Sequence, residues 1–573
     1  MEEEKRAREG GRTISWRLGS YEGAVEQALA AMKEERIIGR IWAHDHTVWN
    51  PNPVEIKNRL GWLHSPGVMA GNIPQLMELA DAVRVDGYTH ALLLGMGGSS
   101  LAPEVLGKIF VPQPGHPQLM ILDSTDPGAV LARAEQCDPS RSLCIVSTKS
   151  GTTLETLSLF KFFYNRVADA LGKGRAGERF IAITDPGSAL ADLAGQHGFR
   201  ATFLNDPHIG GRYSALSCFG LVPAALMGID LNVFLERANS MASDAESSAG
   251  DAAALGAALG ELAMTGRDKM TLVTSPELAS FGDWVEQLLA ESTGKEGRGI
   301  IPVVGEPLGP PEVYGNDRLF IHLRLAGDTE NKAELDGLAR TGHPVITINL
   351  EDRYDLGGQF FLWEMATAVA GWRMGINPFD QPDVESSKVL ARQMMNEYQE
   401  NQGLPFDEKA ALIDGEITVF GGPAVQDFGS ALATFVEQGM LDGAYVALQA
   451  YLQPNPETDQ VLHDLRVRVR DRFKTAVTVG YGPRYLHSTG QLHKGDGGKG
   501  LFVQITADDA VDVPIPDDPG SLTSSMTFGL LKKAQAAGDR RALEDAGRQV
   551  VRFHLGNDIA GGLTRLTKTL ADR

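Results

Sequence analysis

Two turns of the sequence combine glycines with hydroxyl side chains in a way that is typical of anion binding. "GMGGSS" (95–100) follows the apolar run "ALLL", and "STKSGTT" (147–153) follows the apolar run "SLCIV". Each turn precedes a helical pattern, and hydroxyls and free amides at a helix N-terminus hold phosphate with help from the helix dipole. A single such turn would favour simple helix capping. Two of them in one predicted sheet favour a phosphate site.

The spacing of these turns argues against a nucleotide. Neither turn fits the GxxxxGK[ST] pattern of nucleoside triphosphate binding or the GxGxxG pattern of dinucleotide binding. We therefore expect a phosphosugar as the ligand.

Two further positions could supply acid–base chemistry. Arg212 follows two glycines in "IGGRYSALS" and offers a permanently charged fork for a phosphate or a developing enolate oxygen; the alternative is a surface ion pair. Gln287 and Glu291 share one face of the predicted helix in "WVEQLLAESTGK". Glu291 lies in the last helical turn, where the negative end of the dipole disfavours the charged carboxylate and makes it a stronger general base. The alternative for Glu291 is a solvated carboxylate.

The elements that must position these residues follow an α/β rhythm. Apolar runs alternate with helical patterns from residue 91 to about 206, and the rhythm restarts with "KMTLVTSPEL", "GIIPVVGEP", "RLFIHLRLAGD" and "PVITINLED". Continuous apolar strands joined by helices predict doubly wound parallel sheets. In such sheets ligands bind at the carboxyl ends of the strands, where both glycine-rich turns lie.

The chain is too long for one core, and we predict a polar tail with a helical N-terminal segment at 1–85, followed by α/β domains at 86–245 and 246–400. A polar stretch from 396 to 415 is predicted to be a linker. A C-terminal α/β domain at 415–573 is expected, with strands in "EITVFGG", "TAVTVGY" and "LFVQITAD" and a long terminal helix pair.

Five motifs occur in an order that resembles the phosphoglucose isomerase family, whose fold contains two sugar-isomerase (SIS) domains: "GMGGSSLAPEVL", "STKSGTTLET", "GGRYSALS", "QLLAESTGK" and "NPFDQPDVESSK". The resemblance spans about residues 90–395. "IKNRLGWL" and "GYGPRYLHSTGQLHKG" look like the isomerase half of bifunctional transaldolase/phosphoglucose isomerases. We expect no transaldolase half, because the helical segment begins near Met1.

The resemblance implies interconversion of glucose 6-phosphate and fructose 6-phosphate in glycolysis and gluconeogenesis, through a cis-enediol(ate), with no metal and no cofactor. Glu291 would be the base, Arg212 would stabilise the intermediate and Lys388 would assist ring opening. The substrate-binding residues implied are Gly98, Ser99, Thr148, Lys149, Ser150, Thr153, Gln287 and Gln381.

The ring-opening histidine of that family is missing from its usual place shortly after the base. The corresponding stretch, "GEPLGPPEVYGND" (305–317), contains no histidine, and His322 lies in a predicted strand, where a satisfied core imidazole is expected. The pattern "LHSTGQ" occurs instead in the C-terminal domain. We therefore predict that His487 opens the ring, donated within the chain or across a dimer; the alternative places His487 and His493 in an ordinary surface loop.

Composition limits the partners. With a net charge of −21 the chain repels nucleic acid and anionic lipid. The sequence contains no apolar run of about 18 residues, the length that a membrane span needs. Three cysteines without CxxC spacing argue against disulfides or a zinc site and fit the cytoplasm. "AHDH" (43–46) offers two metal ligands without a third, so a polar helix end is favoured there.

Two alternative functions remain open. A related isomerase that acts on mannose 6-phosphate would use the same phosphate turns. A phosphosugar sensor would use them too, but it would not need Glu291, Arg212 and Lys388 together. The sequence also leaves open a homodimer, and functional pairing with a separate transaldolase.

Overall fold

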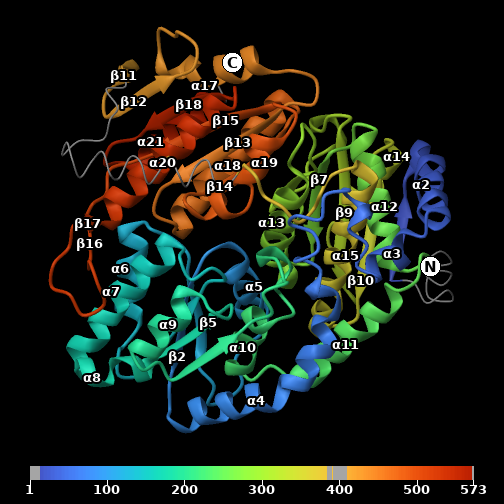
Figure 1. The fold of residues 1–573 in the computed structure, drawn as a ribbon. Helices are drawn as coiled ribbons and strands as arrows, with labels where there is room; N and C mark the ends of the chain where they lie inside the picture. The colour runs from blue at the N-terminus through green and yellow to red at the C-terminus, as the bar shows by residue number, and fades with distance from the viewer. Residues whose placement is uncertain (1–12, 384–389, 391–408, 571–573) are drawn as a thin grey trace.

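A computed structural model describes residues 13–383, 390 and 409–570, which form three α/β units (Figure 1). Each unit has one main sheet, in agreement with the two α/β domains and the C-terminal α/β domain that the sequence predicts. In Figure 1 the third unit, in orange and red, lies above the first unit, in cyan, and beside the second, in green and yellow. None of the helices in these described residues has the length and apolarity that a bilayer crossing needs.

The first unit is a parallel sheet in the order β3-β2-β4-β5-β6. Its strands are β2 (His90–Gly95), β3 (Gln118–Leu122), β4 (Ser142–Ser147), β5 (Phe180–Thr184) and β6 (Ala201–Leu204). The chain leaves β2 toward β3 and then returns to the other side of β2 with β4. This reversal brings the turns after β2 and β4 to neighbouring carboxyl ends, where an open α/β sheet forms a crevice.

Helices flank this sheet on both faces. They are α5 (Leu101–Ile109), α6 (Pro127–Gln136), α7 (Leu154–Leu171), α8 (Lys173–Ala176), α9 (Ala189–Gln196) and α10 (Cys218–Leu226); the next helix, α11 (Leu231–Asp244), packs mainly against the second unit. Short 3-10 helices η4 (Gly97–Ser99) and η6 (Gly211–Tyr213) carry two of the glycine-rich turns.

The second unit has the sheet order β1-β10-β9-β7-β8. Its strands are β1 (Ile14–Arg17), β7 (Lys269–Thr274), β8 (Ile301–Val304), β9 (Arg318–Leu325) and β10 (Val345–Leu350); its helices are α12 (Asp251–Met264), α13 (Phe281–Thr293), α14 (Lys332–Arg340) and α15 (Leu356–Met374). β1 was not predicted: "ISWR" pairs antiparallel with β10 at the sheet edge. The short run precedes the helical N-terminal segment, and its pairing partner lies more than 300 positions away. No local sequence pattern therefore predicts β1.

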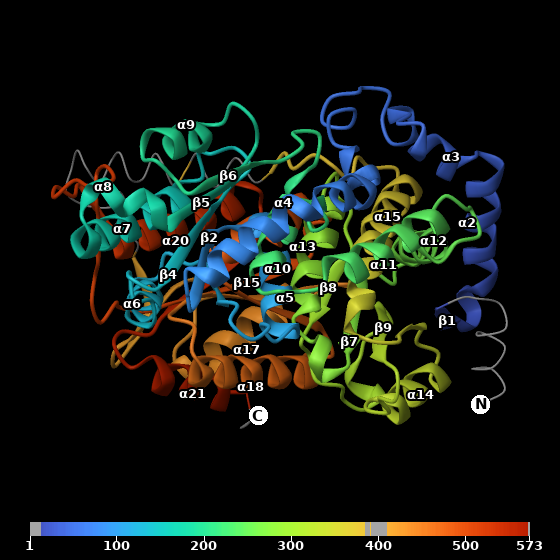
Figure 2. The same ribbon diagram turned by 90° about the horizontal axis from the view of Figure 1, so that it is seen from below.

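The N-terminal segment is helical beyond β1, as predicted. It contains α2 (Glu22–Glu34), α3 (Ile37–Trp42) and α4 (Ser65–Val85), which pack beside the helices of both sheets (Figure 2). α15 is buried almost all round, as its apolar composition requires.

The third unit has the sheet order β11-β12-β18-β15-β13-β14. Its strands are β11 (Ala410–Asp414), β12 (Ile417–Gly421), β13 (Tyr445–Tyr451), β14 (Ala476–Tyr481), β15 (Gly500–Thr506), β16 (Pro514–Ile515), β17 (Met526–Thr527) and β18 (Gln549–His554), and its helices are α17 (Phe428–Gly439), α18 (Pro456–Phe473), α19 (Gly490–Gly495), α20 (Phe528–Asp545) and α21 (Ile559–Lys568). Three of its main-sheet strands, β11, β13 and β18, were not predicted. β18 separates the two terminal helices, and most of the predicted linker lies outside the described residues.

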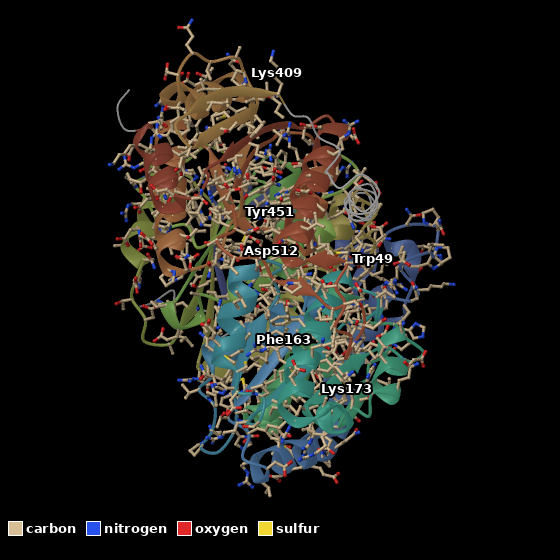
Figure 3. All side chains as sticks on the ribbon, turned by 90° about the vertical axis from the view of Figure 1, so that its left-hand side faces the viewer. Trp49, Phe163, Lys173, Lys409, Tyr451 and Asp512 are labelled. Atoms are coloured by element: carbon tan, nitrogen blue, oxygen red, sulfur yellow. The ribbon has the colours of Figure 1, made fainter. Side chains whose placement is uncertain are left out.

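Apolar contacts bind the third unit to both others. Val513, Ile515 and Phe528 join the core formed by the first sheet and α7, while Tyr445 and Phe502 pack with α13 and β8 of the second unit. Figure 3 shows Tyr451 and Asp512 of the third unit above Phe163 of the first. These shared apolar cores position the third unit against the other two.

Candidate active site

The two phosphate-type turns meet at the crevice of the first unit. The hydroxyl of Ser147 donates a hydrogen bond to the carbonyl oxygen of Ser99 over 3.0 Å, which ties the turn after β4 to the turn after β2. The hydroxyls of Thr148 and Thr153 lie 2.9 Å apart. The chain therefore gathers the predicted hydroxyl donors beside the N-terminus of α7.

Lys149 and Ser150 occupy the outer part of the same turn. The ammonium of Lys149 forms an ion pair with Asp185 and donates to the carbonyl of Pro207, 2.9 Å away. The exposed Ser150 hydroxyl accepts hydrogen bonds from the amide and hydroxyl of Thr152. In this structure the Lys149 side chain is thus engaged at the rim of the crevice.

Gly98 allows the first turn to approach the turn that carries Arg212. A Cβ atom at Gly98 would lie 2.1 Å from the carbonyl oxygen of Gly211 and 3.0 Å from the amide nitrogen of Arg212. No side chain fits in that space, so a glycine is required at this position for a steric reason. A pattern of glycines in the sequence signals a turn but does not reveal which backbone it contacts.

Arg212 is buried, with 3% of its side chain exposed, so the alternative of a surface ion pair is wrong. Its Nη1 lies 3.3 Å from Oε1 of Glu291, and its Nε donates to the Ser292 hydroxyl over 2.8 Å. Nη2 donates to the carbonyls of Pro378 and Asp380. Such contacts fix the plane of the guanidinium beside the carboxylate.

Glu291 lies in the last turn of α13, and its side chain is 9% exposed. The alternative of a solvated carboxylate is therefore wrong. Oε2 of Glu291 accepts a hydrogen bond from Nε2 of Gln287, 3.1 Å away, as the shared helix face predicts. Gln381, which is exposed, accepts from Arg212 Nη1 over 3.0 Å. Lys388 lies outside the described residues.

His487 of the third unit reaches this crevice. It ends the 3-10 helix η10 (Arg484–His487) at the carboxyl end of β14, and its carbonyl accepts from Gln287 Nε2 over 2.7 Å. A Cβ atom on Gly97 would lie 2.8 Å from that same carbonyl oxygen. The alternative of a surface loop is wrong for this segment, since His493 is also fully enclosed and burial holds its pKa well below the usual value.

The imidazole of His487 is paired with a carboxylate that the sequence analysis did not select. Nε2 of His487 lies 2.9 Å from Oε1 of Glu155 in the first turn of α7, and that oxygen also accepts from Gln535 of α20. A carboxylate that holds one imidazole nitrogen orients the ring and sets its tautomer. The position of Glu155, directly after the hydroxyl-rich turn, was the available signal.

A second arginine anchors η10. Arg484 contacts the carboxylates of Glu104 and, at 3.3 Å and 3.7 Å, those of Asp123 and Asp283. Burial opposes its charge, but these three carboxylates together hold the pKa of Arg484 well above its usual value. The three partners come from the first and second units, so Arg484 joins all three units three residues before His487.

Lys295 is another residue near the Arg212–Glu291 pair that was not predicted, although the quoted motif "QLLAESTGK" ends on it. Its Nζ lies 2.7 Å from a carboxylate oxygen of Asp380, with 1% of its side chain exposed. Burial, followed by the charge of Arg212, lowers the pKa of Lys295 to about 8. The ammonium therefore titrates close to neutral pH beside the candidate base.

His322 lies in β9, as predicted, and burial lowers its pKa to about 4. It is not a satisfied imidazole, because its Nε2 has no hydrogen-bond partner among the described residues. Over the same described ranges no group of three or more side chains is arranged to ligate a metal, and His44 of "AHDH" instead contacts His64.

The fold and this site define a class: two SIS domains whose crevice holds a hydroxyl-rich anion turn and a buried arginine–glutamate pair. The family model described as phosphoglucose isomerase matches residues 80–299. The glucose-6-phosphate isomerase of Carboxydothermus hydrogenoformans is 30% identical over 393 residues, which cover 58% of this chain and 84% of that relative. That of Rubrobacter xylanophilus is 29% identical over 417 residues, covering 64% and 94%.

A solved structure with the same fold agrees with these sequence matches. A glucose-6-phosphate isomerase from Chlamydia trachomatis superposes with a TM-score of 0.57 at 18% identity, covering 68% of this chain and 89% of that one. The chain belongs to the phosphoglucose isomerase family. The matched region contains Arg212 and Glu291 and ends well before His487.

Proposed function

We infer that this protein is an aldose–ketose isomerase that interconverts D-glucose 6-phosphate and D-fructose 6-phosphate. The observation that carries the proposal is the buried contact of 3.3 Å between the Arg212 guanidinium and the Glu291 carboxylate, beside a turn built for phosphate. A carboxylate base next to a fixed cation is what proton abstraction alpha to a carbonyl requires. Relatives that are matched over most of their own length carry the name of this activity.

The substrate phosphate would bind at the two turns. The hydroxyls of Ser99, Thr148, Ser150 and Thr153 and the N-terminus of α7 supply donors there. Thr148 and Thr153 already contact each other, so a phosphate oxygen can take the place of their mutual hydrogen bond. The sugar then extends toward Glu291 at the end of α13.

While the proton of the C2 hydroxyl passes to O1, Glu291 would take the proton from C2 of the open-chain aldose and return it to C1. Removal of that proton leaves an enediolate, whose oxygen gains negative charge next to Arg212. Gln287 holds one oxygen of Glu291 and leaves the other facing Arg212. The proton is returned rather than lost, so the step is an isomerisation that uses only protein groups.

His487 would open the sugar ring before that step. With Nε2–H donated to Glu155, Nδ1 is the nitrogen free to exchange a proton between the ring oxygen and the C1 hydroxyl. The carboxylate of Glu155 stabilises the imidazolium that forms during the exchange. In this arrangement the first and third units of a single chain together supply the acid–base group.

Finer parts of the proposal extend the same reasoning. Gln381 would contact the substrate near Arg212, and Lys388, in the segment that follows Gln381, would assist ring opening. We also propose that the protein forms a homodimer, works beside a separate transaldolase and is located in the cytoplasm.

A coupled assay tests the function directly. Fructose 6-phosphate is supplied and glucose 6-phosphate is detected through its NADP-linked oxidation; steady turnover is expected. Mannose 6-phosphate is offered in parallel as substrate and as competitor, because the phosphate turns do not sense the configuration at C2. Binding of fructose 6-phosphate without turnover would reject the enzyme and favour a sensor.

A further inference from the structure

A cavity outside the candidate active site has a volume of about 520 Å³. It lies between the 3-10 helix η3 (Gly61–His64) with the start of α4 on one side and residues 204–209 with the start of α10 on the other. α4 and α10 pack against each other at this place (Figure 2). Pockets of 300–1,000 Å³ are the usual size for small organic ligands.

The polar wall of this cavity is mainly basic. The exposed side chains of Lys57, His64 and His208 line it together with His44, and the Nε2 atoms of His44 and His64 lie 3.0 Å apart. Asp206 is the one carboxylate in the lining, and one of its oxygens is held by the backbone amide of His208 at 2.9 Å. An anion would therefore find more donors than acceptors here.

Ser65 supplies an unused donor. It lines the cavity, it is 4% exposed, and its Oγ has no hydrogen-bond partner among the described residues. A buried hydroxyl without a partner costs free energy unless another group completes its hydrogen bond. A ligand in the cavity would be such a group.

The start of α10 adds a positive field. Ser217, the N-cap, and Cys218 both line the cavity, and the positive end of the helix dipole lies there. Opposite them the wall is apolar, with Val68, Met69 and Leu204. A cationic end combined with an apolar wall fits an organic anion better than a bare inorganic ion.

We propose that this cavity is a second anion site, which binds a small organic phosphate and is distinct from the substrate phosphate turns. The phosphate contacts Lys57 and Ser65 near the start of α10, and the organic body lies against Val68, Met69 and Leu204.

The cavity has a short physical connection to Arg212. Leu60 and Ile209 form an antiparallel bridge, and the amide of Gly61 donates to the carbonyl of His208 over 3.0 Å. Ile209 is followed directly by Gly210 and by η6, which carries Arg212. A ligand that orders residues 204–209 therefore also biases the turn that positions Arg212, and this coupling rests on the proposed function.

Binding is tested on the full chain with phenyl phosphate, which is not an aldose, and with inorganic phosphate, both by isothermal titration calorimetry. Phenyl phosphate is expected to bind, and Lys57→Met should raise its Kd about tenfold, a loss of about 1.4 kcal/mol. Ser65→Ala, which removes an unpaired hydroxyl and should not harm folding, is expected to raise the Kd about fivefold. The control Lys33→Met, an exposed lysine in α2, should leave the Kd unchanged.

A further variant separates this cavity from the substrate site. Thr153→Val weakens anion binding at the phosphate turn and should leave binding in the cavity intact. Phenyl phosphate binding that responds to Thr153→Val but not to Lys57→Met or Ser65→Ala would overturn the proposal. Equal affinity for inorganic phosphate and phenyl phosphate would overturn the assignment to an organic ligand.

The coupling has its own readout. Phenyl phosphate should change the isomerase kcat of the wild-type chain at saturating substrate by about twofold or more, and Lys57→Met should remove this effect without changing basal turnover. Purely competitive inhibition that persists in Lys57→Met would overturn the coupling. Because calorimetry does not depend on turnover, failure of the isomerase assay and failure of the anion site remain distinguishable.

Discussion

Two buried acid–base pairs face the same crevice but are built differently. Arg212 and Glu291 both lie in the region that matches the family model, and Arg212 is also held by the Ser292 hydroxyl and by the backbone carbonyls of Pro378 and Asp380. His487 and Glu155 are 332 positions apart, and their contact depends on the docking of the whole third unit. The first pair, called the local pair below, is therefore held within the first two units, whereas the second, called the distant pair, can also be lost through a change in the third unit.

The difference assigns different chemical steps to the two pairs. Proton transfer between C1 and C2 needs a base at a fixed distance, which Glu291 of the local pair would provide in the proposed function. Ring opening also proceeds slowly in water without any catalyst, so a group supplied by an added domain can accelerate it. If this division is correct, changes at the two pairs should affect different substrates to different degrees.

Glu291→Gln should have the largest effect. The amide keeps the shape of the side chain and its contact with Gln287, but it cannot accept the substrate proton. We expect kcat to fall by about 10³–10⁴-fold, the upper part of the range for general acid–base catalysis, with little change in substrate Kd. Stopped-flow isomerisation and calorimetry with fructose 6-phosphate measure the two quantities. Turnover within tenfold of wild type would contradict the role of Glu291.

Gly98→Ala should disturb the Arg212–Glu291 pair by moving the turn that carries Arg212. The new methyl group would lie 2.1 Å from the carbonyl of Gly211, so the turn that carries Arg212 must move. A misplacement of about 1 Å is expected to cost about 10²-fold in kcat. Gly210→Ala is the matched control, because a Cβ atom there has only ordinary contacts at 3.6 Å and beyond. Equal losses in the two variants would mean that the close approach at Gly98 has no special role.

The sequence predicted the local pair and its scaffold better than the distant one. The alternating apolar runs gave the first sheet, and helix periodicity placed Gln287 beside Glu291, because both signals are carried by neighbouring residues. His487 was selected only by a short motif, and Glu155 was missed because nothing in α7 alone reveals a partner in the third unit. β1 was missed for the same reason, since its partner strand β10 is distant in sequence.

His487→Ala tests the second pair. Isomerisation of the cyclic substrate should fall by roughly 10- to 100-fold, at or below the lower end of the usual range for acid–base catalysis, because the ring also opens unassisted. The loss should shrink when freshly generated open-chain substrate is supplied in rapid mixing. Glu155→Gln is the companion variant and should give a smaller loss of the same kind. Near-normal turnover of the cyclic sugar by His487→Ala would reject the assignment.

Arg484→Met tests whether the contact between His487 and Glu155 depends on the docking of the third unit. The change leaves the carboxylates of Glu104 and Asp123 without their shared cation, and burial already raises the pKa of Asp123. We expect about 2 kcal/mol lower stability in urea unfolding, less than for a fully buried pair because Arg484 is partly exposed. Turnover should fall about fivefold through displacement of His487. Equal losses in the His487→Ala background would show that Arg484 does not act through His487.

The smallest effect concerns pH and Lys295. Its pKa of about 8 means that the ammonium is charged below pH 8, where it adds positive potential beside the developing enediolate, and neutral above pH 8. The value of kcat/KM should therefore fall by a few fold as the pH rises through 8. Lys295→Met should show at every pH the lower value that the wild type reaches above pH 8, and should therefore lack this decline. Lys295→Arg should keep its charge and move the decline to higher pH. Because Lys295 contacts Asp380 beside Arg212, the decline should persist in His487→Ala. A decline that disappears with His487 instead would transfer this titration from the local pair to the distant one.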